Sequence, residues 1–219
     1  MKVLLVDDHS LFREGLRLLL VRTGGSFDVY EAGTCAQAFE VVAEHNDIRL
    51  ILLDLELPDM GGQAALVLLR ERHPHIPVVV LSARDSRADV LEAINLGAMG
   101  FIPKSSDSMA LAEALQLVLA NGVYLPTAVL GANPAATAAS AERRTAVGRE
   151  LLREAGLSDR QIDVLALLVQ GLPNKLIADR LGLAEPTIKT HVAACLRALN
   201  VRNRTQAVLA VGRLGARLA

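Results

Sequence analysis

The stretch LILLDLELPDMGG occupies residues 50–62 and begins with four apolar residues followed by an acid, Asp54. A second apolar run, VVVLSA, occupies residues 78–83. Continuous apolar runs of this length are typical of strands covered on both faces, as in parallel sheets. Both stretches therefore predict buried strands of a parallel sheet, each with a polar residue at its carboxyl end.

Similar units of strand and helix fill the first 125 residues. Apolar residues spaced three and four apart follow each run and indicate helices between the strands. Five such units predict a doubly wound α/β domain with a parallel five-stranded sheet. We expect strands at Lys2–Val6, Asp28–Glu31, Leu50–Asp54, Val78–Leu81 and Met99–Ile102, and helices within Leu11–Leu20, Ala36–Val42, Ala64–Leu69, Val90–Leu96 and Leu111–Leu119.

Residues 126–148 are rich in Ala, Pro, Thr, Ser and Gly, which predicts a linker between domains at 1–125 and 149–219, although its alanine-rich part could be helical. From Leu157 onward, helical periodicity predicts an all-α module of four helices. The expected helices run from an N-cap at Ser158 to Gln170 with Gly171 as C-cap, from a cap at Asn174 to Leu181, from Glu185 to Leu199, and from Thr205 to Gly215.

The composition, 52% hydrophobic and 21% charged over 219 residues, indicates a globular chain of two domains. No apolar run reaches the roughly 20 residues that span a bilayer, and acids follow the start too closely for a signal peptide, so we expect a cytoplasmic protein without a membrane partner. Cys35 and Cys195 stand alone and are interpreted as packing residues. Residues 1–125 hold 10 basic and 17 acidic residues, net −7, whereas residues 126–219 hold 13 and 7, net +6. This asymmetry could be chance scatter of charges on two solvated surfaces. Otherwise it suggests a cation site in the first half and a polyanion partner for the second.

Chemically active side chains follow four of the five expected strands. Asp7 and Asp8 follow the first, Asp54 ends the third, Ser82 ends the fourth and Lys104 follows the fifth. The carboxyl ends of parallel strands open on one edge, so these groups should converge. Clustered carboxylates suit Mg²⁺, and with a lysine they suit phosphoryl transfer to an aspartate. Without a Gly-rich Lys-Ser/Thr loop, ATP bound at this site is not the expected phosphate donor.

The third helix of the module has a distinct polar face. Its apolar residues predict a buried stripe, and the opposite face carries small and basic residues that could lie in a DNA major groove or face solvent. The stripe consists of Ile188, Val192, Cys195, Leu196 and Leu199, and the opposite face of Thr190, Ala193 and Arg197 flanked by Lys189 and Ala194.

The segments VDDHSLFREGL (6–16), LILLDLELPDMGG, VVVLSA and GFIPK (100–104) resemble the receiver domain of two-component response regulators, which has a flavodoxin-like fold. The resemblance implies that Asp54 accepts the phosphoryl group and Lys104 contacts it. It also implies that Ser82 moves to hydrogen-bond the phosphate while Phe101 is the aromatic that rotates inward. Asp7, Asp8, Asp54 and the backbone carbonyl of Glu56 would hold Mg²⁺, and His9 would be a residue at the helix start rather than a metal ligand.

The segment from LSDRQ (157–161) to TQAV (205–208) closely resembles the LuxR/NarL/FixJ-type helix-turn-helix output domain. The resemblance implies that the helix from Glu185 reads double-stranded DNA. Ala193 and Ala194 stand where many relatives carry Arg or Lys and Asn, which suggests few direct base contacts, and SDRQ replaces the usual TxRE. The implied base or backbone contacts are Lys189, Thr190, Ala193 and Arg197, and the residues implied to contact phosphate or orient the helix are Asn174, Lys175, Thr187, His191, Arg202 and Arg204.

Together these features predict a transcription regulator that a sensor histidine kinase phosphorylates and that acts as a homodimer when active. Val208, Leu209 and Val211 are candidates either for the dimer surface or for packing within the module. The chain would not be an enzyme beyond its own phosphoryl transfer and dephosphorylation. Two alternatives remain open: a phosphatase that uses Asp54 with Glu56, and an adaptor whose helical module binds protein.

Overall fold

The structure is a computed structural model that describes residues 1–22, 26–120, 122–126 and 147–213. The chain divides into two compact units, one made of Met1–Leu119 with Tyr124–Pro126 and the other of Ala120–Val123 with Thr127–Ala219. Most of the expected linker and the expected helix end at Gly215 lie outside the described residues. No helix in the described ranges combines the length and the apolar character needed to cross a membrane.

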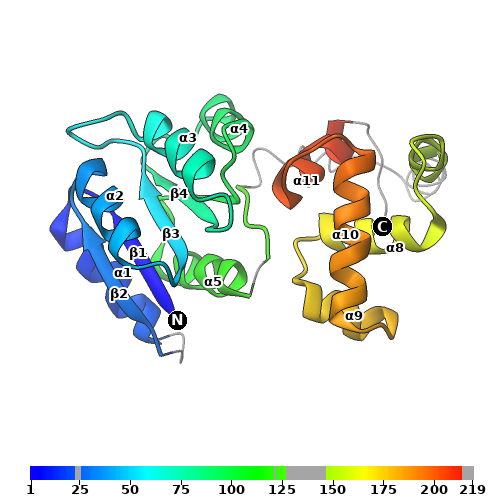
Figure 1. Cartoon of the computed structure of the whole chain (residues 1–219), viewed down its shortest axis with the longest axis horizontal. Helices are drawn as coiled ribbons and strands as arrows, with labels where there is room; N and C mark the ends of the chain where they lie inside the picture. Colours follow the sequence, from blue (N-terminus) through cyan, green and yellow to red (C-terminus); the bar gives the residue numbers. More distant parts are fainter. Residues whose placement is uncertain (23–25, 121, 127–146, 214–219) are drawn as a thin grey trace. The chain divides into compact units, whose positions relative to one another are not determined.

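The first unit contains a five-stranded parallel sheet in the order β2-β1-β3-β4-β5 (Figure 1). This confirms the doubly wound α/β fold that the sequence predicts. The order reverses between β1 and β3, and open sheets of this kind bind ligands at the carboxyl ends of the strands beside such a reversal. The strands are β1 (Lys2–Val6), β2 (Asp28–Ala32), β3 (Ile48–Asp54), β4 (Val78–Ser82) and β5 (Gly100–Pro103).

Helices cover both faces of this sheet. The helices are α1 (Ser10–Arg22), α2 (Cys35–Glu44), α3 (Gly62–Arg72), α4 (Arg87–Asn95) and α5 (Ser108–Leu119). Leu16 and Leu20 of α1 and Leu115 of α5 join one buried cluster with Leu5 and Leu52 of the sheet. Because strand side chains alternate between faces, the neighbouring residues Leu4, Ile51 and Leu53 form the opposite layer, and each is 0% exposed.

The strand register aligns the functional ends of the sheet. Val6 of β1 pairs with Ala32 and Leu53, Asp54 of β3 pairs with Leu81, and Ser82 of β4 pairs with Pro103. The residues that follow or end β1, β3, β4 and β5 therefore meet on one edge. That edge is called the rim below, and it consists of Asp7, Asp8, Asp54, Ser82 and Lys104.

The secondary structure in the described residues of the second unit consists of helices, and the four predicted helices are present. A further helical segment, which begins at residue 147 inside the expected linker, was not predicted. Residues 147–154 are helical, followed by α8 (Asp159–Val169), α9 (Asn174–Leu181), α10 (Glu185–Ala198) and α11 (Arg204–Arg213). Ser158 caps α8 in a reciprocal capping box with Gln161, in which each side chain accepts a hydrogen bond from the other residue's backbone N–H. Gly171 and Gly182 have φ values of 81° and 62°, so glycine suits the left-handed backbone at both helix ends.

The cap of α9 differs from the prediction. Pro173 occupies the cap position with φ −66° and ψ 155°, and Asn174 is the first helical residue. Asparagine is favoured at caps, but the ring of Pro173 already holds the extended backbone that a cap needs. The carbonyl of Pro173 accepts the first helical hydrogen bond from Ile177 N at 3.0 Å.

The packing of α10 and α11 follows the predicted pattern. Ile188 and Cys195 of the predicted stripe are fully buried, and the other three stripe residues are partly buried. Val208, Leu209 and Val211 are 4%, 8% and 0% exposed within the single chain. Of the two roles considered for these three residues, packing is therefore the one that fits.

Candidate functional site

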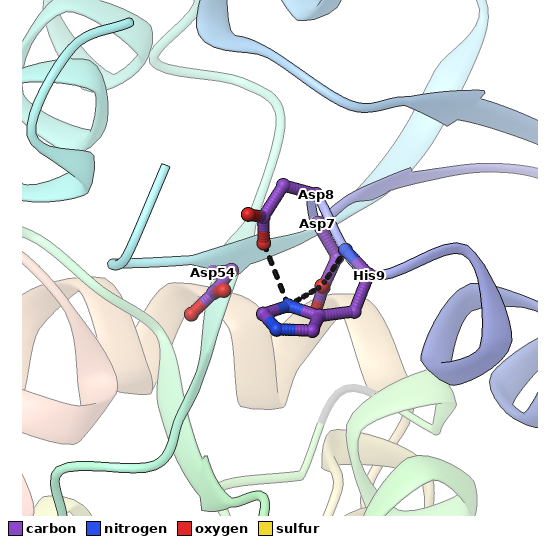
Figure 2. A group of neighbouring side chains, drawn as sticks. All are labelled: Asp7, Asp8, His9 and Asp54. Atoms are coloured by element: carbon purple, nitrogen blue, oxygen red, sulfur yellow. Dashed lines mark hydrogen bonds and ion pairs between the residues drawn. The ribbon is translucent and has the colours of Figure 1, made fainter. Parts of the chain in front are cut away.

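The rim gathers the acids that the sequence placed at strand ends (Figure 2). One ligand atom from each of Asp7, Asp8, His9 and Asp54 lies within 4.8 Å of all the others. Asp7 and Asp54 are 1% and 0% exposed, whereas Asp8 reaches solvent. Three carboxylates this close repel one another strongly unless cations lie among them. The rim is therefore an acidic pocket of the kind that holds a divalent metal ion.

Lys104 is the cation that balances the buried acids in this structure. Its ammonium lies 2.7 Å from Asp7 Oδ2 and 2.7 Å from Asp54 Oδ2. Burial lowers the pKa of Lys104, but hydrogen bonds and charge interactions with Asp54 and Asp7 outweigh burial and raise the pKa above 10.5. The ammonium also lies 4.8 Å from the centre of the Phe12 ring, on α1. Lys104 therefore stays charged at neutral pH and is held from three sides.

The turn after β1 begins helix α1. His9 N donates to Asp7 Oδ1 at 2.8 Å, and the His9 carbonyl accepts from the backbone N–H groups of Phe12 and Arg13. His9 thus stands at the start of the helix, as the resemblance implies. Its ring Nδ1 lies 2.7 Å from Asp8 Oδ1 and 3.3 Å from Asp7 Oδ1, so the ring also borders the acids.

Ser82 and Phe101 are both enclosed. Ser82 is 0% exposed, and its Oγ accepts from Arg84 N at 3.1 Å, while its carbonyl accepts from Lys104 N at 2.9 Å. Ser82, which ends β4, and Lys104, which follows β5, are therefore linked through the backbone. Phe101 is 0% exposed and is the largest fully buried side chain among the described residues. The aromatic thus lies inward in this structure.

In the helical unit, the polar face of α10 is open to solvent. Lys189, Thr190, Ala193 and Arg197 are all exposed, and so is Thr187 near the helix start. Two side chains of this face contact residues of the same helix: Lys189 Nζ lies 3.3 Å from Glu185 Oε1, and Thr190 Oγ1 donates to the Pro186 carbonyl at 3.2 Å. A helix face with exposed small and basic side chains can lie in a DNA major groove.

Two family models match the chain, and together they cover both units. The model of the response regulator receiver domain matches residues 3–116, and the model of the bacterial regulatory proteins of the luxR family matches residues 155–211. The chain belongs to the LuxR-type response regulators. It combines a receiver domain with a LuxR-type DNA-binding domain, the architecture of transcriptional response regulators of two-component systems.

Curated relatives extend over nearly the whole chain. The glycerol metabolism activator of Pseudomonas putida is 39% identical over 211 residues, which cover 96% of this chain and 95% of that protein. The nitrate/nitrite response regulator NarP of Escherichia coli is 36% identical and covers 95% of this chain and 93% of its own length. A LuxR family DNA-binding response regulator from Silicibacter pomeroyi, solved by crystallography, is 34% identical with a TM-score of 0.52, over 58% of this chain and 98% of that chain. The Salmonella typhimurium regulator RcsB shares the fold, with a TM-score of 0.54 at 21% identity over 95% of this chain and 96% of that chain.

The predicted phosphate-contacting residues of the response regulator divide by exposure. Lys175 and Arg202 are exposed, and Asn174 and His191 are partly buried. Arg204 is only 8% exposed and donates from a terminal guanidinium nitrogen to the Leu172 carbonyl at 2.7 Å. Burial lowers the pKa of Arg204 to about 10. Of the two roles that the resemblance allows, orienting the helices fits a buried guanidinium better than contacting phosphate.

Two residues between the end of β3 and the start of α3 have roles that sequence reasoning missed. The carboxylate of Asp59 accepts from the backbone N–H groups of Cys35 and Ala36, both at 3.0 Å, and so joins this loop to the start of α2. Gly62 lies against the backbone that follows the phosphoacceptor candidate: a Cβ here would lie 2.3 Å from Leu55 Cα and 2.5 Å from the Asp54 carbonyl. The adjacent glycines in LPDMGG were the available signal, since close backbone approach requires glycine.

Proposed function

We propose that the response regulator accepts a phosphoryl group on Asp54 from a sensor histidine kinase and that phosphorylation controls its binding to DNA. The observation that carries the proposal is the arrangement at Asp54. Its carboxylate is buried at the rim, one oxygen lies 2.7 Å from the Lys104 ammonium, and the other accepts from Glu56 N at 3.2 Å. The Lys104 ammonium and Glu56 N orient the carboxylate of Asp54, which stays beside the charged groups of the rim.

The residues present fit Mg²⁺, because the donors of Asp7, Asp8 and Asp54 are hard oxygen atoms. These carboxylates, with the backbone carbonyl of Glu56, would hold the ion. When bound, Mg²⁺ supplies positive charge against the phosphoryl oxygens. His9 completes the cluster as a neighbour of the acids and is not assigned as a ligand.

The chain's own residues then perform the transfer. A carboxylate oxygen of Asp54 forms the new bond to phosphorus, and the bond from phosphorus to the donor's leaving group breaks. Lys104 stays charged and its ammonium can donate hydrogen bonds to the oxygens of the phosphoryl group that reaches Asp54. The Ser82 hydroxyl can then donate to a phosphoryl oxygen, and Phe101 would occupy the space behind it. Such a cycle makes the chain a substrate of phosphoryl transfer rather than an enzyme acting on other molecules.

The test compares Asp54→Asn with the matched control Asp47→Asn, which changes an exposed acid paired with Lys2. Labelled acetyl phosphate with Mg²⁺ should label the wild type and the control, and EDTA should abolish labelling. Asp54→Asn should remain unlabelled, and labelling at the wild-type rate would refute the assignment. Sustained hydrolysis of a phosphomonoester by the wild type would favour the phosphatase alternative.

For the DNA-binding domain, we assign base or backbone contacts to Lys189, Thr190, Ala193 and Arg197 on the exposed face of α10. Exposure supports phosphate contacts by Lys175, Thr187 and Arg202, with the partly buried Asn174 and His191 beside them. Arg202→Ala should reduce the slope of log Kd against log salt by about 0.9, because one phosphate contact is lost. Arg153→Ala, which removes an arginine paired with Glu150 and Asp159, is the control and should leave the slope unchanged. If the Kd of the wild type for duplex DNA did not change with salt concentration, the alternative of a protein-binding adaptor would be favoured.

The active form is proposed to be a homodimer, which would present two α10 helices to paired half-sites. Support comes from a fold relative: one solved structure is described as two RcsB dimers bound to two parallel DNAs. Sedimentation of the chain with and without beryllofluoride, a phosphoryl mimic, tests this proposal. A monomer in both conditions, at concentrations that saturate DNA, would contradict it.

A further inference from the structure

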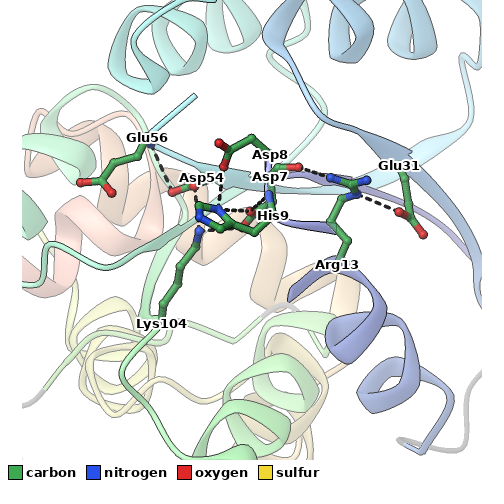
Figure 3. A network of polar contacts seen from close by, with 8 residues as sticks. All are labelled: Asp7, Asp8, His9, Arg13, Glu31, Asp54, Glu56 and Lys104. Carbon is green, nitrogen blue, oxygen red and sulfur yellow. Dashed lines mark hydrogen bonds and ion pairs between the residues drawn. The ribbon is translucent and has the colours of Figure 1, made fainter. Parts of the chain in front are cut away.

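A polar relay joins the second strand of the sheet to the turn that carries Asp7 and Asp8 (Figure 3). Arg13, one turn into α1, donates from Nε to Glu31 Oε2 at 2.8 Å. The same guanidinium donates from a terminal nitrogen to the Asp7 carbonyl at 2.5 Å. Figure 3 shows Arg13 and Glu31 on the side of Asp7 away from Asp54 and Lys104. The relay therefore supports the acids from behind.

The backbone of Asp7 is held at both of its polar groups. Its N–H donates to the Ala32 carbonyl at 3.0 Å, and its carbonyl accepts from Arg13. The register of β1 with β2 ends at Val6 and Ala32, so the bond from Asp7 N to the Ala32 carbonyl closes the ladder at the start of the turn. Glu31 lies on β2 next to Ala32, and through Arg13 it restrains the Asp7 carbonyl as well.

The chemistry of the relay requires an arginine. The side chain of Arg13 is 17% exposed, and its planar guanidinium reaches a carboxylate and a carbonyl at the same time. Hydrogen bonds from a charged donor are roughly twice as strong as neutral ones. A lysine has one nitrogen at a different position and cannot reproduce both contacts with the same geometry.

We propose that Arg13, oriented by Glu31, is a positioning residue that fixes the Asp7–Asp8 turn for binding of a divalent cation. The inference rests on the proposed function, because it assigns Arg13 to the same metal site. Arg13 acts through the Asp7 backbone and does not itself bind the ion. Partners that orient metal ligands typically change metal affinity by 10–100-fold when removed. A contact through one backbone carbonyl should fall at the lower end, about tenfold.

The experiment measures Mn²⁺ binding by the loss of the free-ion signal in electron paramagnetic resonance, with unphosphorylated full-length chain. Arg13→Met should raise the Kd for Mn²⁺ about tenfold, and Glu31→Gln, which keeps the shape but weakens the ion pair, should raise it less. The double variant should be no weaker than Arg13→Met alone, since Glu31 acts through Arg13. Arg22→Met is the matched control, because Arg22 is an exposed residue in the last turn of the same helix and should leave the Kd unchanged.

A second readout separates positioning from general loss of structure. Labelling by acetyl phosphate should need about ten times more Mg²⁺ in Arg13→Met, while the rate at saturating Mg²⁺ returns to within about twofold of wild type. Wild-type Mn²⁺ affinity in both Arg13→Met and Glu31→Gln would overturn the inference and leave the proposed function standing. A wild-type chain that binds no Mn²⁺ would instead overturn the metal site itself. If Arg13→Met does not fold, Glu31→Gln alone decides, and an unchanged Kd in that variant overturns the inference.

Discussion

Replacing Gly62 by alanine tests whether the path from β3 into α3 is set by direct contact with the backbone at Asp54 and Leu55. An alanine Cβ at this position would lie 2.3 Å from Leu55 Cα, 2.5 Å from the Asp54 carbonyl and 2.8 Å from Leu55 C. Ordinary contacts begin at 3.4 Å, so Leu55 Cα must retreat by about 1 Å. All three neighbours are backbone atoms, which cannot rotate out of the way as a side chain can.

The expected cost follows from this geometry. Overpacking a well-packed site destabilises by about 1–3 kcal/mol, and a backbone clash should fall at the upper end. Alanine at the start of a helix returns up to about 1 kcal/mol of helix propensity. The net loss should therefore be about 2 kcal/mol. Because the displaced atoms adjoin Asp54, a shift of about 1 Å should also slow labelling of Asp54 by up to about 100-fold.

The assay pairs Gly62→Ala with Gly61→Ala in urea unfolding and in acetyl phosphate labelling. Gly61 has nothing within 4 Å of its ideal Cβ and a φ of −54°, which alanine adopts easily. Gly61→Ala should therefore leave labelling unchanged and stabilise the receiver domain by about 0.4–1 kcal/mol. Equal stabilities and equal labelling rates for the two variants would refute the reasoning.

Three further predictions concern other described contacts. Arg204→Met should lower stability by about 1–3 kcal/mol, because it leaves the Leu172 carbonyl without its donor, yet the salt dependence of DNA binding should not change; a reduced salt slope would return Arg204 to the phosphate contacts. Hydrogen bonds from the backbone N–H groups of Ala36 and Cys35 hold the pKa of the Asp59 carboxylate below 3.8, so its contribution to stability should be lost as pH falls through that pKa. The urea midpoint of Asp59→Asn should therefore fall less steeply than that of the wild type below pH 4, and an identical fall in both would contradict this. Burial raises the pKa of both the Cys35 and the Cys195 thiols to about 11, so iodoacetamide at pH 8 should leave both unmodified until urea unfolds the chain. The free energy of unfolding should also fall as pH rises from about 9 toward 11. Rapid alkylation of the native chain would show the thiols to be accessible.

The sequence predicts the rim well because the rim follows from topology. In a parallel sheet, any residue at a strand's carboxyl end lies on the same edge, so Asp54, Ser82 and Lys104 could be placed together without knowing a single distance. The exposed face of α10 is likewise a consequence of helical period alone. Patterns of period two and period 3.6 carry this information locally.

Residues that act across elements could not be predicted in the same way. The role of Arg13 depends on β2 lying beside β1, and that of Gly62 depends on the path of a loop. Arg204 illustrates the opposite difficulty: a charged residue near a helix start is usually exposed, and only the packing of α11 near Leu172 buries it. At Asn174 two local preferences compete, and the fixed backbone of Pro173 prevails over the capping preference of asparagine.

The charges of the rim explain why the positioning contacts matter. Asp7, Asp8 and Asp54 bring three negative charges within 4.8 Å, and Lys104 returns one positive charge, so about two negative charges remain to be balanced. A divalent cation supplies that charge only if its ligands already point at one position, since turning a buried carboxylate after desolvation is costly. Lys104 is held by the ring of Phe12, Asp54 by Glu56 N, and Asp7 by Ala32 and Arg13. Lys104, Asp54 and Asp7 are thus each held by a contact outside the cluster. Removing one of these contacts should lower the affinity for the cation more than it lowers the stability of the fold.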